Sequence, residues 1–258
     1  MTPERLQAII AHPGYRLAED DGDFLDSDAA RALRLALEFH RADTYLRAAG
    51  IESTVVVFGS ARVPPPESAA ATALQKSLYN EARRFGYELS LGARHSSGCH
   101  QLVIATGGGP GLMEAANRGA SEAGAPTVGF NIRLPREQFP NPYITPGLAF
   151  QFRYFALRKM HFMFRARALV ALPGGFGTLD EVYEALNLVA TGTIAPIPIV
   201  LVGREYWDRA LPLDMLVSEG YISAADRDSV HYADDGSAAA QLVLAHCGCD
   251  ARAMPAAP

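Results

Sequence analysis

The chain has 258 residues, of which 49% are hydrophobic and 20% are charged, and its formal net charge is −5. A chain of this length can bury one large core or two small ones. The mildly acidic charge balance argues against a general nucleic-acid-binding protein, so no nucleic-acid partner is expected. Local positive charge for a small anionic ligand would come mainly from arginine, because only Lys76 and Lys159 are lysines.

The longest apolar stretches have the length of a strand and are far shorter than a membrane span, so no membrane partner is expected. The N-terminus lacks the pattern of a signal peptide. The three cysteines, Cys99, Cys247 and Cys249, do not make the disulfide framework of a small secreted domain. A cytoplasmic location is the simplest interpretation.

The first 50 residues are predicted to form an N-terminal extension with one long helix. Residues 1–27 are polar and irregular in pattern. The helix is predicted to start near Asp28, a good N-cap, and to stop at Gly50, a good C-terminal residue. We expect a catalytic domain over residues 51–250 and a flexible tail over 251–258.

Short apolar strands alternate with helical segments from residue 54 onward. The predicted strands cover 54–60, 102–109, 127–132, 168–175 and 196–203, and the predicted helices cover 67–85, 110–124, 152–166 and 178–190. A proline-rich loop is expected after residue 132, and helical segments after residue 203. Continuous apolar strands that alternate with helices indicate a parallel sheet covered on both faces. The predicted fold class is therefore α/β, with one doubly wound parallel sheet in a single domain.

Three of the predicted strands end in small residues. These residues are Gly59 with Ser60, Gly107 with Gly108 and Gly109, and Gly174 with Gly175. In doubly wound sheets, ligands bind beyond the carboxyl ends of the strands. The site is therefore predicted to be built from these three loops.

The glycine-rich loops do not match the common cofactor motifs. The stretch TGGGPG has the spacing G-x-G-x-G, and no acidic residue ends the following strand, which argues against dinucleotide binding. Neither lysine follows a glycine, which excludes a Walker-type phosphate loop. The groups His95/Cys99/His100 and His246/Cys247/Cys249 lack the paired spacing of a zinc site, and no G-x-S-x-G turn occurs. We expect neither a metal nor a cofactor.

The two turns GGGPGLME and PGGFGTLDE each lead into a predicted helix. If both helix N-termini lie at the same sheet edge, their backbone N–H groups can hold an anionic small molecule without a lysine. Glycine lets the backbone approach such a ligand closely. Thr178 and Ser60 would add hydroxyl groups.

The acidic residues after the second turn allow two interpretations. Thr178 to Glu181 match the capping box S/T-x-x-E, in which Glu181 only caps its own helix. Glu114 is similarly explained as a first-turn acid. Alternatively, Glu181 could stabilise the positive charge that develops on a sugar ring when a glycosidic bond breaks. Arg158, on the preceding helix, could then pair with Glu181 or grip a phosphate.

The segments GGGPGLMEAANRGA, Arg158-Lys159 and PGGFGTLDE occur in the same order as in the LONELY GUY family of phosphoribohydrolases, which this sequence resembles. The likeness extends over roughly residues 53–220 and includes NPYIT and GREYW, which are similar to the longer bacterial branch. Members of this family long carried the name lysine decarboxylase. A decarboxylase that uses pyridoxal phosphate needs a Schiff-base lysine, and Lys159 on an arginine-lined helix is a poor candidate.

The resemblance implies a Rossmann-like fold and hydrolysis of a purine nucleoside 5′-monophosphate, including a cytokinin nucleotide, to the free base and ribose 5-phosphate. It implies that Arg158 and Glu181 are the catalytic pair. The residues that it implies in substrate binding are Gly107, Gly108, Gly109, Gly111, Glu114, Gly174, Gly175, Gly177 and Thr178. Gly59 and Ser60 of the first loop, and Lys159, are also predicted to bind substrate. It also implies a homodimer or a higher oligomer built from dimers, with the site near the subunit interface.

The sequence departs from the family at two places. Many short members have Met-His shortly before the Arg-Lys pair, where this chain has Phe155-Ala156-Leu157, so the base pocket is expected to differ. Residues 91–100 look like an insertion. Two other functions stay open: a carrier that binds a nucleotide or cofactor without cleaving it, and an oligomeric scaffold.

Overall fold

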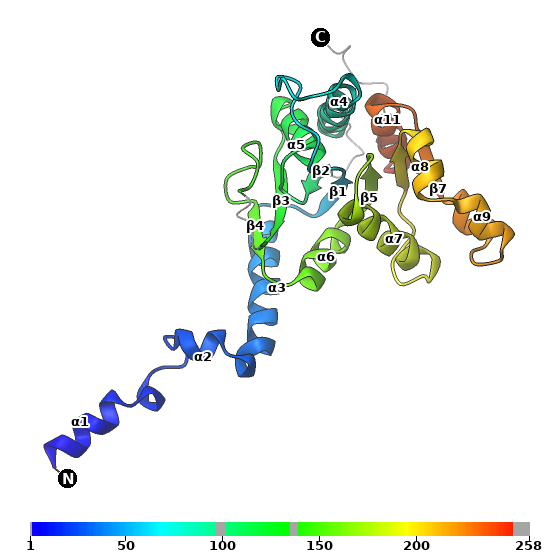
Figure 1. The fold of residues 1–258 in the computed structure, drawn as a ribbon. Coiled ribbons are helices and arrows are strands. Elements are labelled where there is room, and N and C mark those ends of the chain that lie inside the picture. The colour runs from blue at the N-terminus through cyan, green and yellow to red at the C-terminus, as the bar shows by residue number, and fades with distance from the viewer. Residues whose placement is uncertain (1, 96–101, 135–138, 250–258) are drawn as a thin grey trace.

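The computed structural model describes residues 2–95, 102–134 and 139–249. They form one parallel sheet of seven strands in the order β4-β3-β2-β1-β5-β6-β7 (Figure 1). The strands are β1 Ser53–Phe58, β2 Leu102–Thr106, β3 Thr127–Ile132, β4 Ala149–Phe152, β5 Ala166–Ala171, β6 Ile199–Val202 and β7 Val230–Ala233. The predicted Rossmann-like α/β class is confirmed.

Helices surround the sheet and also form the N-terminal extension. The α-helices are α1 Pro3–Ala11, α2 Gly22–Asp26, α3 Arg31–Ala48, α4 Ala73–His95, α5 Leu112–Glu122, α6 Phe155–Phe164, α7 Phe176–Ala190, α8 Arg204–Ala210, α9 Leu213–Ser218, α10 Ala224–Asp228 and α11 Gly236–His246. Two short 3-10 helices, Pro13–Tyr15 and Asp28–Ala30, lie in the extension. The extension projects from the body as an arm, and α3 joins the two (Figure 1).

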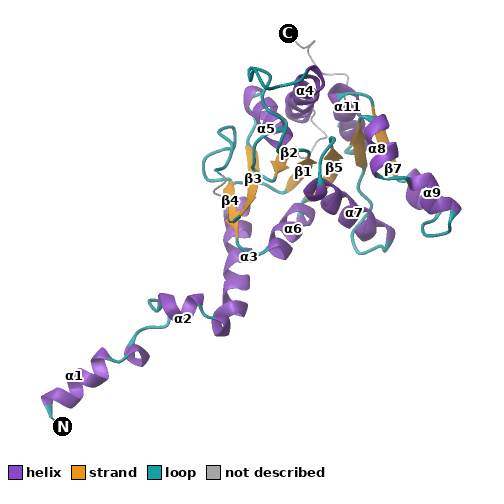
Figure 2. Cartoon of the chain, in the orientation of Figure 1, coloured by secondary structure: helices purple, strands orange, loops and turns teal. Residues whose placement is uncertain are grey.

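Each face of the sheet has its own apolar core, because successive strand residues point to opposite faces. On one face, Val55 and Val57 of β1 pack with α4, α5 and α11. On the other face, Val56 and Phe58 of the same strand pack with α3, α6, α7 and α8. Figure 2 shows the strands between these two helical layers. Burial on both faces explains why the central strands read as continuous apolar runs.

The strand order reverses direction beside β1. From β1 the chain moves outward through β2, β3 and β4, and it then returns to β5 on the other side of β1. The connections after β1 and β5 therefore leave the sheet in opposite directions, which opens a crevice between adjacent strand ends. This topology places the functional site.

The helices α4 and α5 touch through two glycines. A Cβ at Gly119 would lie 1.9 Å from the carbonyl oxygen of Arg83, and a Cβ at Gly86 would lie 2.2 Å from that of Ala116. Both clashes would be with backbone, so a side-chain rotation cannot relieve them. The two glycines therefore allow the backbones of α4 and α5 to pack in direct contact.

Several predicted elements differ from the observed ones. The strands β4 and β7 were not predicted, because β4 is an edge strand in which only alternate residues are buried, and β7 has the sequence VHYA. The helix α4 runs to His95, so residues 91–95 are its last residues, and residues 96–100 lie outside the described part. That residues 91–100 are an insertion relative to the family stays a prediction.

The prediction for the N-terminal extension was partly wrong. Residues 1–27 were expected to be irregular, yet α1 and α2 lie within them, and the long helix α3 begins at Arg31. The helix α1 does carry apolar residues at helical spacing, Leu6, Ile9 and Ile10, which are exposed, and α2 is only five residues long. The tail at 251–258 lies outside the described residues, and the domain boundaries stay a prediction.

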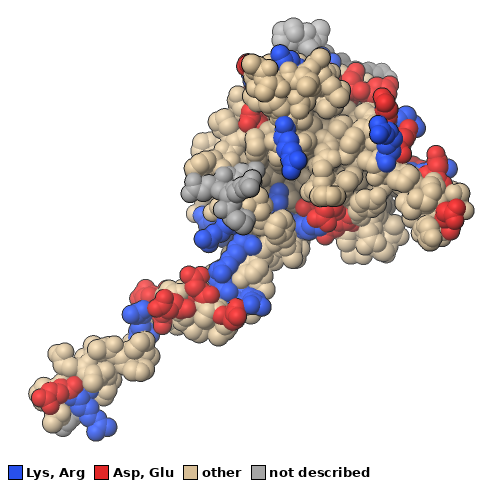
Figure 3. Space-filling view, in the orientation of Figure 1, with Lys and Arg blue, Asp and Glu red and all other residues tan. Residues whose placement is uncertain are grey.

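Within the described residues, no helix is both long and apolar enough to cross a membrane. Figure 3 shows charges of both signs along the arm and over this face of the body, with no continuous basic surface on it.

Replacing Gly119 with alanine should lower the free energy of unfolding by about 1–3 kcal/mol, because the added methyl group overpacks the α4–α5 contact. Urea denaturation measures this change. The matched control is Ser121→Ala, an exposed site on the same helix, which should change stability by less than about 0.5 kcal/mol. Equal stability of Gly119→Ala and wild type would contradict the packing described here.

Candidate functional site

A cleft of about 780 Å³ opens where the connections after β1 and β5 diverge. Its walls come from the loop after β1, the start of α6, the turn after β5 and the first two turns of α7. The lining residues are Phe58, Gly59, Ser60, Ala61, Arg62, Val63, Leu78, Met113, Phe155, Arg158, Pro173, Gly174, Gly175, Phe176, Gly177, Thr178, Leu179, Asp180 and Glu181. The two loops are joined directly, since the Ser60 N–H donates to the Pro173 carbonyl at 3.1 Å.

The turn after β5 presents a helix N-terminus to this cleft. The helix α7 begins at Phe176 with Gly175 as N-cap, and no side chain caps it. A Cβ at Gly175 or Gly177 would have no neighbour within 4 Å, so space lies beside both residues. The first amides of a helix have no carbonyl partner within the helix. The turn therefore offers N–H groups and the positive end of the helix dipole to an anion.

The capping box predicted at Thr178 and Glu181 is wrong. Because α7 starts two residues earlier than predicted, Thr178 lies in the first turn of the helix and is not its N-cap. The Thr178 side chain instead lies against Gly174, where a Cβ would come within 2.1 Å of the threonine Oγ1. Glu181 is therefore free of the role that would have explained it most simply.

Glu181 is 5% exposed, and its Oε2 has no hydrogen-bond partner in the described part of the protein. Burial raises the pKa of this carboxyl from 4.5 to about 7. The charges of Lys159 and Arg158 oppose the shift, and those of Glu184 and Asp180 add to it. A carboxyl group with a pKa near neutrality, facing a cleft, is suited to proton transfer and to electrostatic stabilisation of a cation.

The side chain of Arg158 reaches from α6 to the end of β2. Its Nε donates to the carbonyl of Phe130 on β3 at 2.8 Å, and its guanidinium lies 5.1 Å from the ring centre of Phe162. A Cβ at Gly107 would come within 2.6 Å of the Arg158 Nη2, so the glycine makes room for the guanidinium. Burial lowers the pKa of Arg158, but an arginine stays charged in a protein. The predicted catalytic pair thus faces one cleft without a direct ion pair between its members among the residues described.

Lys159 points elsewhere. Its Nζ lies 2.9 Å from Asp180 Oδ2 and 3.2 Å from Glu184 Oε2, and it lines a second cleft of about 730 Å³ between α6 and α7. The lysine acts on Glu181 through charge and does not line the first cleft. Its predicted contact with substrate stays a prediction. The exposed Met160 and Phe164 of α6 also line this second cleft.

The homodimer that the resemblance implies stays a prediction as well.

The loop Gly107–Gly111 supports the cleft more than it lines it. Gly111, at φ +76°, leaves no room for a side chain, because a Cβ would lie 2.4 Å from the carbonyl of Ser60. That carbonyl accepts the Leu112 N–H at 3.1 Å, and a Cβ at Gly59 would lie 2.8 Å from the Cβ of Leu112. The loop Gly107–Gly111 therefore holds the loop after β1 against the start of α5.

Asn141 holds the same loop from its other side. Its N–H donates to the Gly108 carbonyl at 2.9 Å, and its Nδ2 donates to the Gly109 carbonyl at 3.1 Å and to Asn117 Oδ1 at 3.0 Å. Glu114, also predicted to bind substrate, accepts a hydrogen bond from the Tyr79 hydroxyl at 3.0 Å and does not line the cleft.

The sequence prediction missed the apolar residues of the cleft. Phe155, Phe176, Met113, Leu78 and Val63 line it together with Arg62. Phe176 is 93% exposed, and its place between glycines in PGGFGT was a signal that it could not be buried. The sulfur of Met113 lies beside Gly107, 2.9 Å from a Cβ placed there. A polar anion site next to aromatic side chains suits a ligand that joins a phosphate to a flat ring.

The described residues contain no cluster of three or more histidine, cysteine or acidic side chains that could hold a metal ion. Of the two groups considered in the sequence, one includes Cys99 and His100, which lie outside the described residues.

The sequence pattern of the family described as Possible lysine decarboxylase matches residues 113–243, just over half of the chain. The chain belongs to this family. The match includes α6 and α7, and therefore both Arg158 and Glu181. The LONELY GUY membership implied by the motifs is confirmed.

Curated relatives of this family match the chain over part of its length. A probable cytokinin riboside 5′-monophosphate phosphoribohydrolase of Oryza sativa subsp. japonica is 32% identical over 52% of this chain and 58% of its own. A cytokinin riboside 5′-monophosphate phosphoribohydrolase of Arabidopsis thaliana is 29% identical over 50% of this chain and 60% of its own. The match thus spans less than two thirds of either relative.

Solved structures share the fold over more of the chain. A molybdenum cofactor binding protein from Rippkaea orientalis has a TM-score of 0.51 and 19% identity, covering 75% of this chain and 96% of its own. A molybdenum cofactor carrier protein from Chlamydomonas reinhardtii has a TM-score of 0.51 and 23% identity, covering 76% and 98%. Identities this low support only the shared architecture.

Glu181→Gln should stabilise the protein at alkaline pH. The folded state holds the Glu181 proton more tightly than the unfolded chain, so stability falls as pH rises from 4.5 to about 7 and stays lower above it. The full cost is about 3 kcal/mol. We expect the variant to have a Tm higher than wild type by about 5 °C at pH 8 and unchanged at pH 4.5, measured by calorimetry.

The control for this measurement is Glu184→Gln, one turn later on α7, which removes a carboxylate that is paired with Lys159. It should give no gain in Tm at pH 8. A Glu181→Gln variant with the same Tm as wild type at pH 8 would show that the carboxylate is not destabilised by burial.

Proposed function

We propose that the protein hydrolyses the N-glycosidic bond of a purine nucleoside 5′-monophosphate, releasing the free base and ribose 5-phosphate. The observation that carries the proposal is the buried carboxylate of Glu181, whose Oε2 has no hydrogen-bond partner among the described residues. It lies in the same cleft as an open helix N-terminus and the Arg158 side chain. The curated relatives are phosphoribohydrolases of cytokinin riboside 5′-monophosphates, which supports this class of reaction.

The 5′-phosphate binds at the start of α7 in this proposal. Backbone N–H groups around Gly175 and Gly177 donate to it, and the Thr178 hydroxyl and the helix dipole add to the attraction. Arg158, on α6, supplies positive charge that attracts the phosphate. Its guanidinium N–H groups donate hydrogen bonds to the phosphate or to a ribose hydroxyl. No metal ion is required for this binding.

Glu181 acts on the sugar ring. As the bond between C1′ and the base breaks, the electron pair leaves with the base and positive charge develops on the ribose. A carboxylate in a poorly solvated cleft stabilises that charge more strongly than one in water. The same carboxylate, with a pKa near 7, accepts a proton from the water that attacks C1′, and the departing base takes up a proton from solvent.

The base lies against the apolar side chains of the cleft. Phe155 and Phe176 offer aromatic faces to a planar ring, and Met113 adds a polarisable contact. Such a surface is compatible with an N6-prenylated adenine as well as with adenine.

Incubation with AMP should release adenine, and Glu181→Gln should lower kcat by roughly 100-fold or more while AMP still binds. Chromatography measures base release, and calorimetry measures AMP binding. The matched control is Asp180→Asn, the neighbouring exposed carboxylate that pairs with Lys159, which should keep kcat within a few-fold. A Glu181→Gln variant as fast as wild type would remove Glu181 from the reaction. The same assay with N6-prenylated AMP tests whether a cytokinin nucleotide is also a substrate.

The value of kcat/KM should rise with pH and level off above an inflection near 7, because only ionised Glu181 stabilises the sugar cation, and kcat/KM reports the free enzyme. The substrate phosphate loses its second proton near pH 6. Measuring the affinity for ribose 5-phosphate over the same pH range separates the ionisation of the phosphate from that of Glu181. A flat profile from pH 5.5 to 8.5 would contradict the assignment.

A carrier that binds without cleaving is the second candidate. It is favoured by two proteins of similar fold, a molybdenum cofactor binding protein and a molybdenum cofactor carrier protein. A carrier needs the open turn at α7 but has no use for a destabilised carboxylate. If wild type and Glu181→Gln both bind AMP and neither releases adenine, the carrier is supported over the hydrolase.

A further inference from the structure

The N-terminal arm contacts the body next to the helix that carries Arg158. That helix, α6, starts after Tyr154, and no side chain of its own segment caps it. The carboxylate of Glu38 on α3 instead binds the backbone N–H groups of the N-cap residue, Tyr154, and of the residue before it. Glu38 Oε2 accepts the Arg153 N–H at 2.8 Å, and Oε1 accepts the Tyr154 N–H at 3.0 Å.

Tyr154 connects this carboxylate to Arg158 through its backbone. The Tyr154 N–H is bound by Glu38, and the Tyr154 carbonyl accepts the Arg158 N–H at 3.2 Å. A single residue, Tyr154, therefore lies between the arm and the first turn of α6. The guanidinium at the other end of Arg158 is fixed by Phe130 and fits against Gly107.

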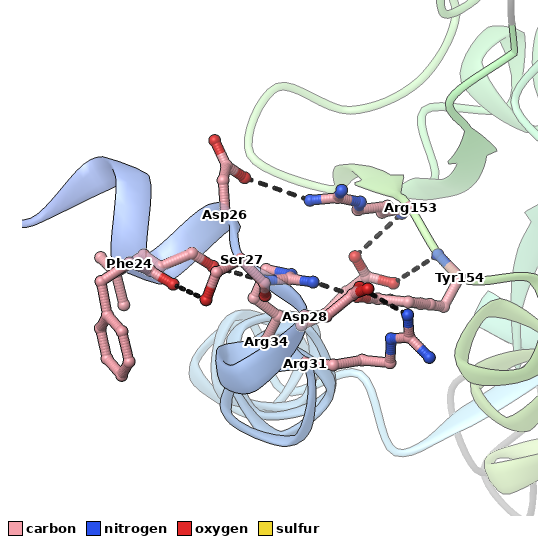
Figure 4. Close-up of polar contacts among 10 residues, drawn as sticks. Phe24, Asp26, Ser27, Asp28, Arg31, Arg34, Arg153 and Tyr154 are labelled. Carbon is pink, nitrogen blue, oxygen red and sulfur yellow. Dashed lines mark hydrogen bonds and ion pairs between the residues drawn. The ribbon is translucent and has the colours of Figure 1, made fainter.

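Further contacts hold the arm to the same two residues (Figure 4). Arg153 pairs with Asp26 at 3.2 Å, and Arg34 donates to the Tyr154 hydroxyl at 3.2 Å. Arg34 also donates to the carbonyls of Leu25 and Ser27, which fixes the bend between α2 and α3.

Apolar packing brings α3 and α6 together. The ring of Phe39, next to Glu38, lies 4.9 Å from the ring of the fully buried His161 and 6.1 Å from that of Phe164. Glu38 therefore extends from a packed helix, which limits the freedom of its side chain.

We propose that Glu38 is a positioning residue, which orients Arg158 in the cleft by fixing the N-terminus of α6. This inference rests on the proposed function for its kinetic consequences. A carboxylate at a helix N-terminus is favoured by the dipole, and its two hydrogen bonds to backbone N–H groups are assisted by its charge. The helix is only ten residues long. Without the two hydrogen bonds that Glu38 accepts from the residues before it, its first turn, which includes Arg158, would fray.

Glu38→Gln is the sharpest variant, because it keeps the shape of the side chain but replaces one acceptor oxygen with an NH2 donor. One of the two N–H groups then loses its partner. The matched control is Asp28→Asn, which neutralises an exposed carboxylate of the same arm that pairs only with Arg31 in the described structure.

The kinetic test is a double-mutant cycle with AMP at pH 7. Glu38→Gln should lower kcat/KM about tenfold in the wild-type background and less than about twofold in the Arg158→Ala background, since its effect passes through Arg158. In the wild-type background it should also raise the inflection of the pH profile, because a displaced guanidinium lowers the pKa of Glu181 less. Asp28→Asn should change neither quantity. Equal losses in both backgrounds would overturn the proposal.

Hydrogen exchange tests the contact independently of catalysis. Glu38→Gln should speed exchange of the amides at 153–158 about tenfold or more, while the amides of β1 exchange as in wild type, which also shows that the variant is folded. Unchanged exchange at 153–158 would overturn the proposal. If the wild-type protein releases no base, the proposed reaction fails separately, and the same cycle measured on AMP affinity decides whether Glu38 positions Arg158.

Discussion

The removal of one carboxylate from water is the constraint on which the site depends. Glu181 is buried on α7, has an oxygen without a hydrogen-bond partner in the described structure, and has two cations near it. Lys159 is paired with Asp180 and Glu184, and Arg158 is bound to Phe130, so neither cation neutralises Glu181 by direct contact. The carboxyl group therefore keeps a pKa near 7. A fold tolerates such a cost where function requires it.

The glycines of the site have two separate physical roles. Gly175 and Gly177 border open space, where a ligand can approach the backbone. Gly59, Gly107 and Gly111 instead border other protein atoms, and each allows two elements to touch. A single motif, glycine at the end of a strand, thus serves either ligand binding or assembly of the cleft.

The N-terminal extension supports the site from outside the cleft, as Gly107 and Gly111 do. It contributes no side chain to the cleft, yet Glu38 and Arg34 contact the two residues that precede α6. The loop between β4 and α6 consists of Arg153 and Tyr154, and a carboxylate from α3 provides both of its backbone N–H groups with acceptors. The direction of Arg158 therefore depends on a segment more than a hundred residues earlier in the chain.

The sequence by itself determined the parallel sheet, the three loops at its edge and the family. Apolar strands buried on both faces give continuous runs, and the glycines that end β1 and β5 predicted the two loops that line the cleft. It also predicted Arg158 and Glu181 as a catalytic pair from the order of the motifs, and both side chains line the same cleft. Only the tertiary structure decided that Thr178 is not an N-cap, that Lys159 faces a second cleft, and that Gly107 accommodates a guanidinium. These features depend on contacts between segments distant in sequence, and local propensity carries no information about such contacts. The same reason kept β4 and the role of Glu38 out of reach, since an edge strand and a cap from another helix are defined only by their neighbours.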